Sequence, residues 1–178
     1  MRKVVAYELL SLDGVAEEPN RFVAEFDAEM QENLGRVIAA QDAVLPGRRT
    51  YDEWAEFWPS SDLAPFAGFI NSVQKYVVTS TAPRVDWAHS TFITGGLLDI
   101  LTELKQEPGG DIGLHGSIEL TRSLLGRGLV DELRLVVSPA LQGEGRRLFD
   151  DGLSGRLVLT RTVTSPSGSL LLDYQVRS

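Results

Sequence analysis

Short apolar runs alternate with segments of helical periodicity along most of the chain, and this alternation restricts the possible folds more than any other feature. Residues 4–10 form a β-branched and apolar run that ends at Ser11-Leu12-Asp13-Gly14, which is typical of a buried strand followed by a turn. The apolar residues that come next recur at the spacing of one helix face: Phe22, Phe26, Met30, Leu34 and Ile38. Strands that alternate with helices favour a parallel sheet covered by helices.

The rest of the chain continues this pattern. Further strands are predicted at residues 43–45, 75–80, 91–94, 111–115 and 133–137. Helices are predicted to open between Gly47 and Thr50 and to cover residues 97–106 and 118–126, with a short helix near 64–73. Two strand-like segments, 156–163 and 170–176, enclose Ser165-Pro166-Ser167-Gly168 as in a hairpin. The sequence therefore predicts an α/β fold with a mostly parallel central sheet, flanked by helices, and an antiparallel C-terminal hairpin.

Length and composition restrict the function classes. The 178 residues fit one domain, which we expect to span residues 1–178. The 17 Lys and Arg against 25 Asp and Glu residues give a net charge of −8, which argues against nucleic acid as the main partner. With no Cys and only two His, we expect neither thiol catalysis nor a metal site. Because no apolar run is long enough for a membrane span and no signal peptide is recognisable, we expect a cytoplasmic protein without membrane contact.

Candidate chemistry lies where predicted strands run into helices, because helix N-termini bind anions. At the first such junction Gly47 permits close backbone approach, and Thr50 offers a hydroxyl. Arg48 and Arg49 can hold a phosphate through paired hydrogen bonds. The alternative is an ordinary helix start whose arginines are solvated.

Two further junctions carry small or hydroxyl-bearing residues. Gly116-Ser117-Ile118-Glu119 opens a predicted helix whose backbone N–H groups can hold a pyrophosphate, although glycine before a helix is common. Thr79-Ser80-Thr81 places three hydroxyls just past a strand, where such groups usually bond to their own backbone. The sequence contains neither the Gly-x-Gly-x-x-Gly pattern of dinucleotide-binding folds nor a phosphate loop with Gly-Lys-Ser/Thr.

Aromatic residues follow the arginine pair at helical spacing. Tyr51, Trp54 and Trp58 form either part of the core or a wall on which a flat heterocycle stacks.

Asp13 follows the first strand, either as a turn residue or as a polar group that orients or protonates a substrate ring. Burial against the tryptophans would raise the pKa of Asp13. We interpret His115 as a strand residue packed near a junction and not as a catalyst.

The order of these segments is more specific than any one of them. It runs through Ser11–Gly14, Pro46–Tyr51, Lys75–Ser80, His115–Ser117, Gly128-Leu129-Val130-Asp131-Glu132-Leu133, and Pro139–Gly145 with Leu148-Phe149. This order resembles the dihydrofolate-reductase-like family over nearly the whole chain. Within that family the chain is most similar to the reductase domain of the bifunctional riboflavin-biosynthesis deaminase/reductase. The stretches at 128–133 and 139–149 are the most specific parts of the resemblance.

The resemblance implies a dihydrofolate-reductase-like fold that binds NADPH at the three junctions. Gly47, Arg48, Arg49 and Thr50 match the family segment that holds the adenosine end and its 2′-phosphate, and Thr79 and Ser80 match a hydroxyl pair near that phosphate. Gly116, Ser117, Ile118 and Glu119 match the turn over the pyrophosphate. The implied activity is reduction of a pterin- or pyrimidine-like heterocycle, of the 5-amino-6-(5-phosphoribosylamino)uracil reductase type. The alternatives are dihydrofolate reductase activity and NADPH binding without turnover.

Three further expectations accompany the resemblance. Gln31 stands where dihydrofolate reductases carry a carboxylate on the first long helix, although Asp27 is one turn away. The Asp-Asp-Pro of riboflavin-type reductases is replaced by residues 54–59, which read Trp-Ala-Glu-Phe-Trp-Pro. We also expect a homodimer, because the apolar strand at residues 133–137 and the segment after it can present an edge that needs covering, and riboflavin-type relatives pair through this region.

Overall fold

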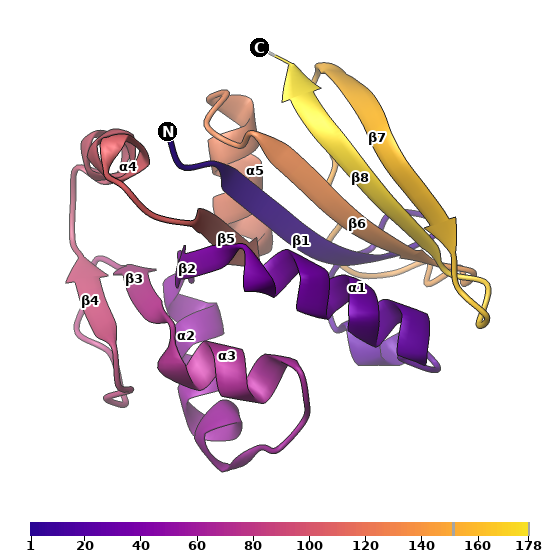
Figure 1. The fold of residues 1–178 in the computed structure, drawn as a ribbon, viewed down its shortest axis with the longest axis horizontal. Coiled ribbons are helices and arrows are strands. Elements are labelled where there is room, and N and C mark those ends of the chain that lie inside the picture. Colours follow the sequence, from indigo (N-terminus) through magenta and orange to yellow (C-terminus); the bar gives the residue numbers. More distant parts are fainter. Residues whose placement is uncertain (151, 178) are drawn as a thin grey trace.

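The computed structural model describes residues 1–150 and 152–177, which form an eight-stranded sheet with the strand order β4-β3-β2-β5-β1-β6-β8-β7 (Figure 1). The strands are β1 (Val4–Ser11), β2 (Gln41–Val44), β3 (Gln74–Val78), β4 (Ser90–Ile93), β5 (Asp111–His115), β6 (Glu132–Ser138), β7 (Arg156–Thr164) and β8 (Leu170–Arg177). All pairs from β4 across to β6 are parallel, and the C-terminal hairpin adds β8 and β7 in antiparallel pairing. The predicted fold class is confirmed.

Helices cover both faces of the sheet. They are α1 (Ala28–Ala39), α2 (Arg48–Phe57), α3 (Phe66–Ser72), α4 (Leu97–Gln106) and α5 (Ile118–Gly126), with single 3-10 turns at Pro19–Arg21 and Trp58–Ser60. Residues of α1, α2 and α3 share one apolar cluster, and residues of α4 and α5 share the other. The central strand β1 alternates between them, since Ala6 belongs to the α5 side and Tyr7 to the α1 side. This burial on both faces explains the nearly unbroken apolar run in its sequence.

The first long helix begins later than its apolar periodicity predicts. It starts at Ala28, because the Asp27 carboxylate accepts a hydrogen bond from the Met30 N–H at 3.0 Å and so caps the helix. Phe22 and Phe26 precede it and pack as isolated side chains of a loop.

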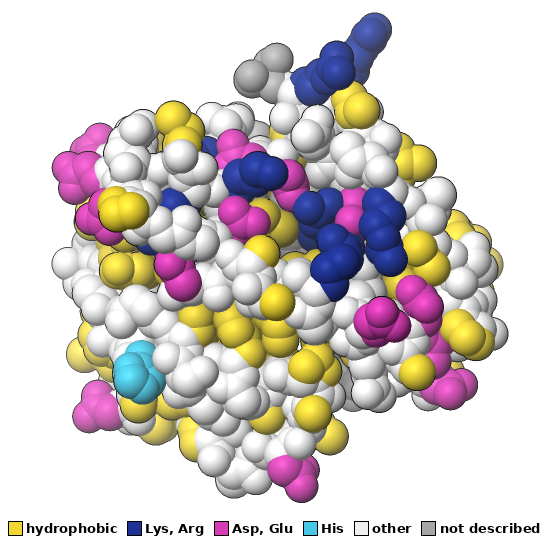
Figure 2. Space-filling view, viewed as in Figure 1, with side chains coloured by type: hydrophobic (Ala, Val, Ile, Leu, Met, Phe, Trp, Pro, Cys, Tyr) yellow, Lys and Arg dark blue, Asp and Glu magenta, His cyan; other side chains and the backbone are white. Residues whose placement is uncertain are grey.

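Arg36, farther along α1, forms an ion pair at 2.8 Å with the buried Asp173 of β8. Figure 2 shows basic side chains gathered on this face of the molecule.

The parallel strands all end at the same edge of the sheet. The loops that leave β1, β2, β3 and β5 therefore bring the three predicted junctions and the Asp13 turn to one side of the molecule. None of the helices within the described residues is long and apolar enough to cross a membrane. In the same residues, no cluster of three or more His, Cys, Asp or Glu side chains is arranged to hold a metal ion.

Candidate active site

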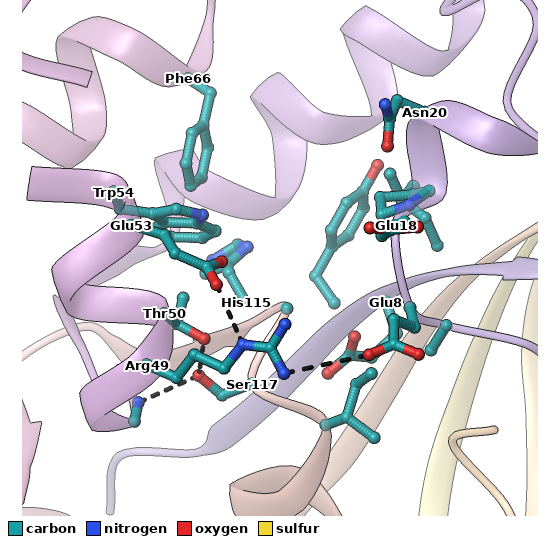
Figure 3. A pocket seen from close by; sticks show the side chains of 18 of the residues that line it. Glu8, Glu18, Asn20, Arg49, Thr50, Glu53, Trp54, Phe66, His115 and Ser117 are labelled. Carbon is teal, nitrogen blue, oxygen red and sulfur yellow. Dashed lines mark hydrogen bonds and ion pairs between the residues drawn. The ribbon is translucent and has the colours of Figure 1, made fainter. Parts of the chain in front are cut away.

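A cavity of about 820 Å³ lies at this edge of the sheet (Figure 3). The junction after β2 contributes Gly47, Arg49 and Thr50 to its wall, and the junction after β5 contributes residues 116–120. Residues 7–9 of β1 and residues 16–20 of the loop that follows also line the cavity. Two of the three predicted junctions thus face one space, as the resemblance implies.

The side chain of Ser117 joins the two junctions. Its Oγ accepts a hydrogen bond from the Gly47 N–H at 3.0 Å, and its hydroxyl donates to Thr50 Oγ1 at 2.9 Å. No side chain caps either α2 or α5, so the N–H groups of both first turns are available to a ligand. Gly116 has a φ of +67°, a conformation that favours glycine. The two helix N-termini therefore place uncapped N–H groups at the cavity wall, in an arrangement that can bind an anion.

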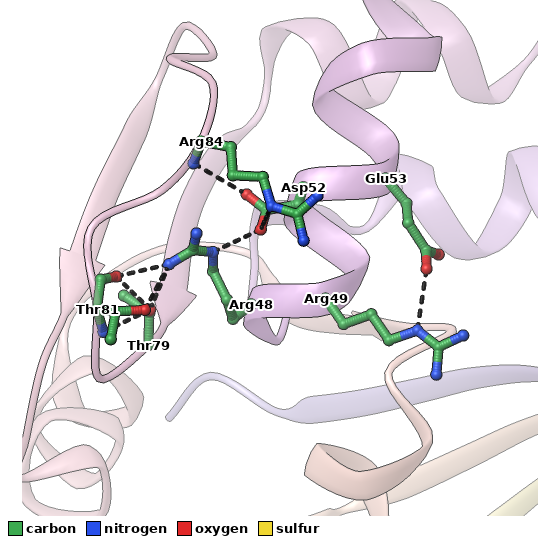
Figure 4. A network of polar contacts seen from close by, with 7 residues as sticks. All are labelled: Arg48, Arg49, Asp52, Glu53, Thr79, Thr81 and Arg84. Carbon is green, nitrogen blue, oxygen red and sulfur yellow. Dashed lines mark hydrogen bonds and ion pairs between the residues drawn. The ribbon is translucent and has the colours of Figure 1, made fainter.

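The two arginines of the first junction point to different places (Figure 4). Arg48 donates to Asp52 Oδ2 at 2.7 Å and to both oxygens of Thr81 at 2.8 Å, and lies 3.4 Å from Thr79 Oγ1. It lines a second hollow of about 550 Å³ together with Arg49 and Arg84. Arg49 pairs with Glu53 at 2.9 Å, and Glu53 lines the same hollow. A phosphate bound in the second hollow would therefore lie near all three arginines.

Of the hydroxyl pair predicted after β3, only one member lies in this network. Thr79 is buried beside Arg48, Ser80 is exposed, and neither residue lines the cavity or the second hollow. Thr81 has the position beside Arg48 that the sequence suggested for Ser80, because the chain turns sharply after β3, and Thr81 lines the second hollow. Sequence spacing alone did not distinguish adjacent hydroxyls in this turn.

Two of the three predicted wall aromatics line the cavity. Trp54 and Trp58 lie with their ring centroids 6.1 Å apart, and both stack edge-on against Phe66, at 5.4 and 4.9 Å. The prediction for Tyr51 is wrong. Its side chain is fully buried on the opposite side of α2, where its hydroxyl accepts a hydrogen bond from the Trp87 N–H at 2.9 Å. Tyr51 belongs to the core.

Asp13 lies outside the cavity wall. Its carboxylate accepts hydrogen bonds from the Ser11 hydroxyl at 2.6 Å and from the N–H groups of Gln142 and Gly143 at 3.0 and 2.7 Å. These bonds hold the pKa of Asp13 well below its usual range, so the raised pKa expected for a catalytic acid is wrong. Asp13 fastens the loop after β6 to the loop after β1, a structural role close to the alternative of a turn residue.

Among the cavity residues that sequence reasoning did not select as site residues are a buried carboxyl group and a buried imidazole. Glu8 of β1 is 2% exposed, its Oε1 accepts from the Thr121 hydroxyl at 2.9 Å, and burial raises its pKa to about 8. His115 is buried, its Nε2 lies 2.8 Å from Gln41 Oε1, and burial lowers its pKa to about 3. At neutral pH both side chains are therefore uncharged. Their signal in the sequence was a polar residue inside an otherwise apolar buried strand.

The two candidates for the carboxylate of dihydrofolate reductases differ in position. Gln31 of α1 lines the cavity, as the counting along the sequence predicts. Asp27 does not, because its carboxylate caps α1 and also accepts from the Ser167 N–H at 3.0 Å. Glu8 is the carboxyl group placed deepest in the wall.

Comparison with known proteins decides the family. The family model described as the RibD C-terminal domain matches residues 2–171. The chain belongs to the RibD C-terminal domain family. The chain is also similar to the uncharacterized protein YyaP of Bacillus subtilis (strain 168). The two sequences are 30% identical over 171 residues, which cover 92% of this chain and 90% of YyaP.

Solved structures show the same fold for this RibD C-terminal domain. A candidate riboflavin biosynthesis protein from Shewanella sp. PV-4 superposes with a TM-score of 0.79 at 18% identity and covers 99% of both chains. Dihydrofolate reductase from Enterococcus faecalis, solved with NADP(H), superposes with a TM-score of 0.62 at 14% identity over 99% of this chain and 97% of that one. The predicted resemblance to dihydrofolate-reductase-like proteins is confirmed.

Proposed function

We propose that the protein is an NADPH-dependent reductase of a pterin- or pyrimidine-like heterocycle. The observation that carries this proposal is that one cavity joins two uncapped helix N-termini to an aromatic end. The first feature suits a dinucleotide pyrophosphate, and the second suits a flat ring. Membership in the RibD C-terminal domain family and the NADP(H) in the dihydrofolate reductase structure support it.

The residues present fit the cofactor. The N–H groups at the starts of α2 and α5 would hold the pyrophosphate, with Gly47 and Gly116 placing no side chain over the backbone and Ser117 joining the two helix starts. Arg48, Arg84 and Thr81 would hold the 2′-phosphate in the second hollow, with Arg49 at its edge and Thr79 beside Arg48. When bound, the nicotinamide would supply the hydride.

The chain's own residues would position and protonate the substrate ring that accepts the hydride. Trp54 and Trp58 hold the ring against the cavity wall and exclude water from one side. Glu8 keeps its proton at neutral pH because of burial, so it is the carboxyl group that can supply a proton in this cavity. Neutral His115 adds a polar edge without adding charge.

The proposal is tested by titrating NADPH and NADH into the protein and by following NADPH oxidation at 340 nm with dihydrofolate, a pterin and an aminouracil as substrates. NADPH oxidation that depends on one of these rings supports a reductase. Tight NADPH binding without oxidation by any of them would favour the alternative of a binding protein. Failure to bind NADPH at all would overturn the proposal.

We also propose a homodimer, on a basis that differs from the predicted one. The segment 133–137 is β6, which pairs with β1 on one side and β8 on the other and so presents no edge. Within the described residues β7 is one of the two outer strands of the sheet, and its Leu157 and Leu159 are 41% and 48% exposed. Exposed leucines on an outer strand favour pairing with a second copy.

A further inference from the structure

Two polar groups in the wall of the cavity lack partners. Tyr7 Oη and Trp58 Nε1 are both buried and make no hydrogen bond to any described residue. Buried donors without partners destabilise a fold, and proteins rarely keep them unless another molecule satisfies them. Burial also raises the pKa of Tyr7 above its ordinary value, so its hydroxyl stays a donor throughout the neutral range.

Both groups belong to the aromatic end of the cavity. The Tyr7 ring, 6% exposed, lies 5.7 Å from the ring of His115, which in turn lies 5.3 Å from Phe66. The Trp58 ring packs against Phe66 with the ring centroids 4.9 Å apart. The two donors thus belong to one connected set of aromatic rings in the cavity wall.

The positive charges of the cavity are elsewhere. Among the described residues its wall contains the arginines 48, 49 and 146, and each forms an ion pair: Arg48 with Asp52, Arg49 with Glu53 and Arg146 with Glu17. The part of the wall that we call the aromatic end also includes the following residues, none of which is positively charged: Phe26, Gln31, Leu34, Trp54, Leu63, Ala64 and Phe66. A phosphate buried there would lose its water without gaining a cation.

From these contacts we infer that the substrate is an uncharged, phosphate-free heterocycle whose ring acceptors take hydrogen bonds from Tyr7 Oη and Trp58 Nε1. The inference rests on the proposed function, since it assigns the substrate class of the same cavity. It separates this chain from a reductase whose substrate carries a ribose phosphate. The two unpaired donors supply the recognition, and the aromatic rings supply the stacking surface.

The test compares two ligands that share one ring. 5-Amino-6-(ribosylamino)uracil and its 5′-phosphate are titrated into the NADPH complex, with binding followed by calorimetry. We expect the phosphate-free compound to bind about tenfold more tightly. Equal or tighter binding of the phosphate would overturn the inference, as would failure of both uracils and of an uncharged pterin to bind. NADPH affinity is measured separately, so loss of the proposed function is recognised independently.

Variants examine the two donors. Tyr7→Phe and Trp58→Phe keep an aromatic ring and remove one donor each, and Tyr174→Phe on β8, outside the cavity, is the matched control. We expect either cavity variant to weaken binding of the uncharged compound about tenfold and to leave NADPH affinity unchanged. Because the Tyr7 hydroxyl is unpaired, Tyr7→Phe is expected to raise the melting temperature of the ligand-free protein. Unchanged ligand affinity in both variants would overturn the inference.

Discussion

The hydroxyl of Ser117 accepts a hydrogen bond from the backbone N–H of Gly47 at 3.0 Å, which joins the N-termini of α2 and α5 across 70 residues of sequence. Through its second bond, to Thr50 Oγ1, the same side chain also fixes the first turn of α2. The proposed anion site requires both helix N-termini to keep their relative position. Ser117 is therefore a positioning residue for the proposed cofactor.

Ser117→Ala is expected to destabilise the protein by about 1 kcal/mol, because the Gly47 N–H loses its partner. It is also expected to weaken NADPH binding, because no side chain then joins the N-termini of α2 and α5. Chemical denaturation and a fluorescence titration measure the two effects. Ser80→Ala is the matched control and is expected to change neither, as Ser80 is exposed. An Ser117→Ala protein with wild-type NADPH affinity would contradict the positioning role.

The two adjacent arginines are expected to differ in cofactor selection. Arg48→Ala removes a charge-assisted contact to the 2′-phosphate, worth about 1.5 to 3 kcal/mol, and so weakens NADPH relative to NADH about ten- to hundredfold. Arg49→Ala is expected to have the smaller effect, because Arg49 also lines the second hollow but is paired with Glu53 and Glu17. Titration of both cofactors into both variants checks this. Loss of preference in Arg49→Ala alone would place the phosphate elsewhere.

Glu8 is expected to make stability depend on pH. Its pKa is about 8 in the folded protein against an ordinary value of 4.5, so the folded protein holds a proton that the unfolded chain releases between these values. The free energy of unfolding therefore falls as the pH rises from about 4.5 to about 8 and then levels off. Glu8→Gln is expected to lack this component. Denaturation series at several pH values test it, and parallel curves for the two proteins would contradict the raised pKa.

Glu8 is also expected to make the turnover rate depend on pH. If Glu8 supplies the proton, turnover with a reducible ring falls as the pH rises through about 8, and Glu8→Gln is slow at every pH. Thr121→Val, which removes the hydroxyl that Glu8 accepts from, serves as a comparison. That bond lowers the pKa of Glu8, so the variant is expected to shift the descending limb to higher pH. A rate profile of Glu8→Gln identical to that of the wild type would remove Glu8 from the reaction.

Asp13→Asn is expected to lower the melting temperature at neutral pH, because the carboxylate accepts bonds from two backbone N–H groups and a hydroxyl. Since these bonds lower its pKa, the contribution of Asp13 is present above about pH 3.8 and is lost as the pH falls below it. The difference between the two proteins therefore shrinks in acid. NADPH affinity is expected to stay unchanged. A slower turnover with an unchanged melting temperature would restore a catalytic role.

Leu159→Lys is expected to convert the proposed dimer into a monomer of 19.5 kDa, because a charge on the exposed strand β7 opposes pairing. Leu141→Lys, at a leucine that is 76% exposed but lies outside β7, is the control. Sedimentation of the three proteins at micromolar concentration decides the matter. A monomeric wild type would refute the dimer outright.

Periodicity predicted the elements and their order because it reports burial, which local sequence determines. It did not predict which side of α2 meets the cavity: Tyr51, Trp54 and Trp58 share helical spacing, yet only the tryptophans line the site. The partners of Asp13 are about 130 residues away in sequence, so no local pattern could reveal them. The sequence did not show that Glu8 faces the cavity. A strand that is buried on both faces lacks the apolar–polar alternation from which the direction of each side chain is inferred.

The helix α2 lies between the two hollows and contributes to both. Asp52 and Glu56 line only the second hollow, Thr50 and Trp54 line only the main cavity, and three charged residues line both: Arg48, Arg49 and Glu53. Substitutions at Asp52 and Glu56 can therefore alter the proposed nucleotide site without changing the wall of the proposed ring site. Both sets of positions lie within the ten residues of one helix, so a short stretch of sequence can adjust either hollow.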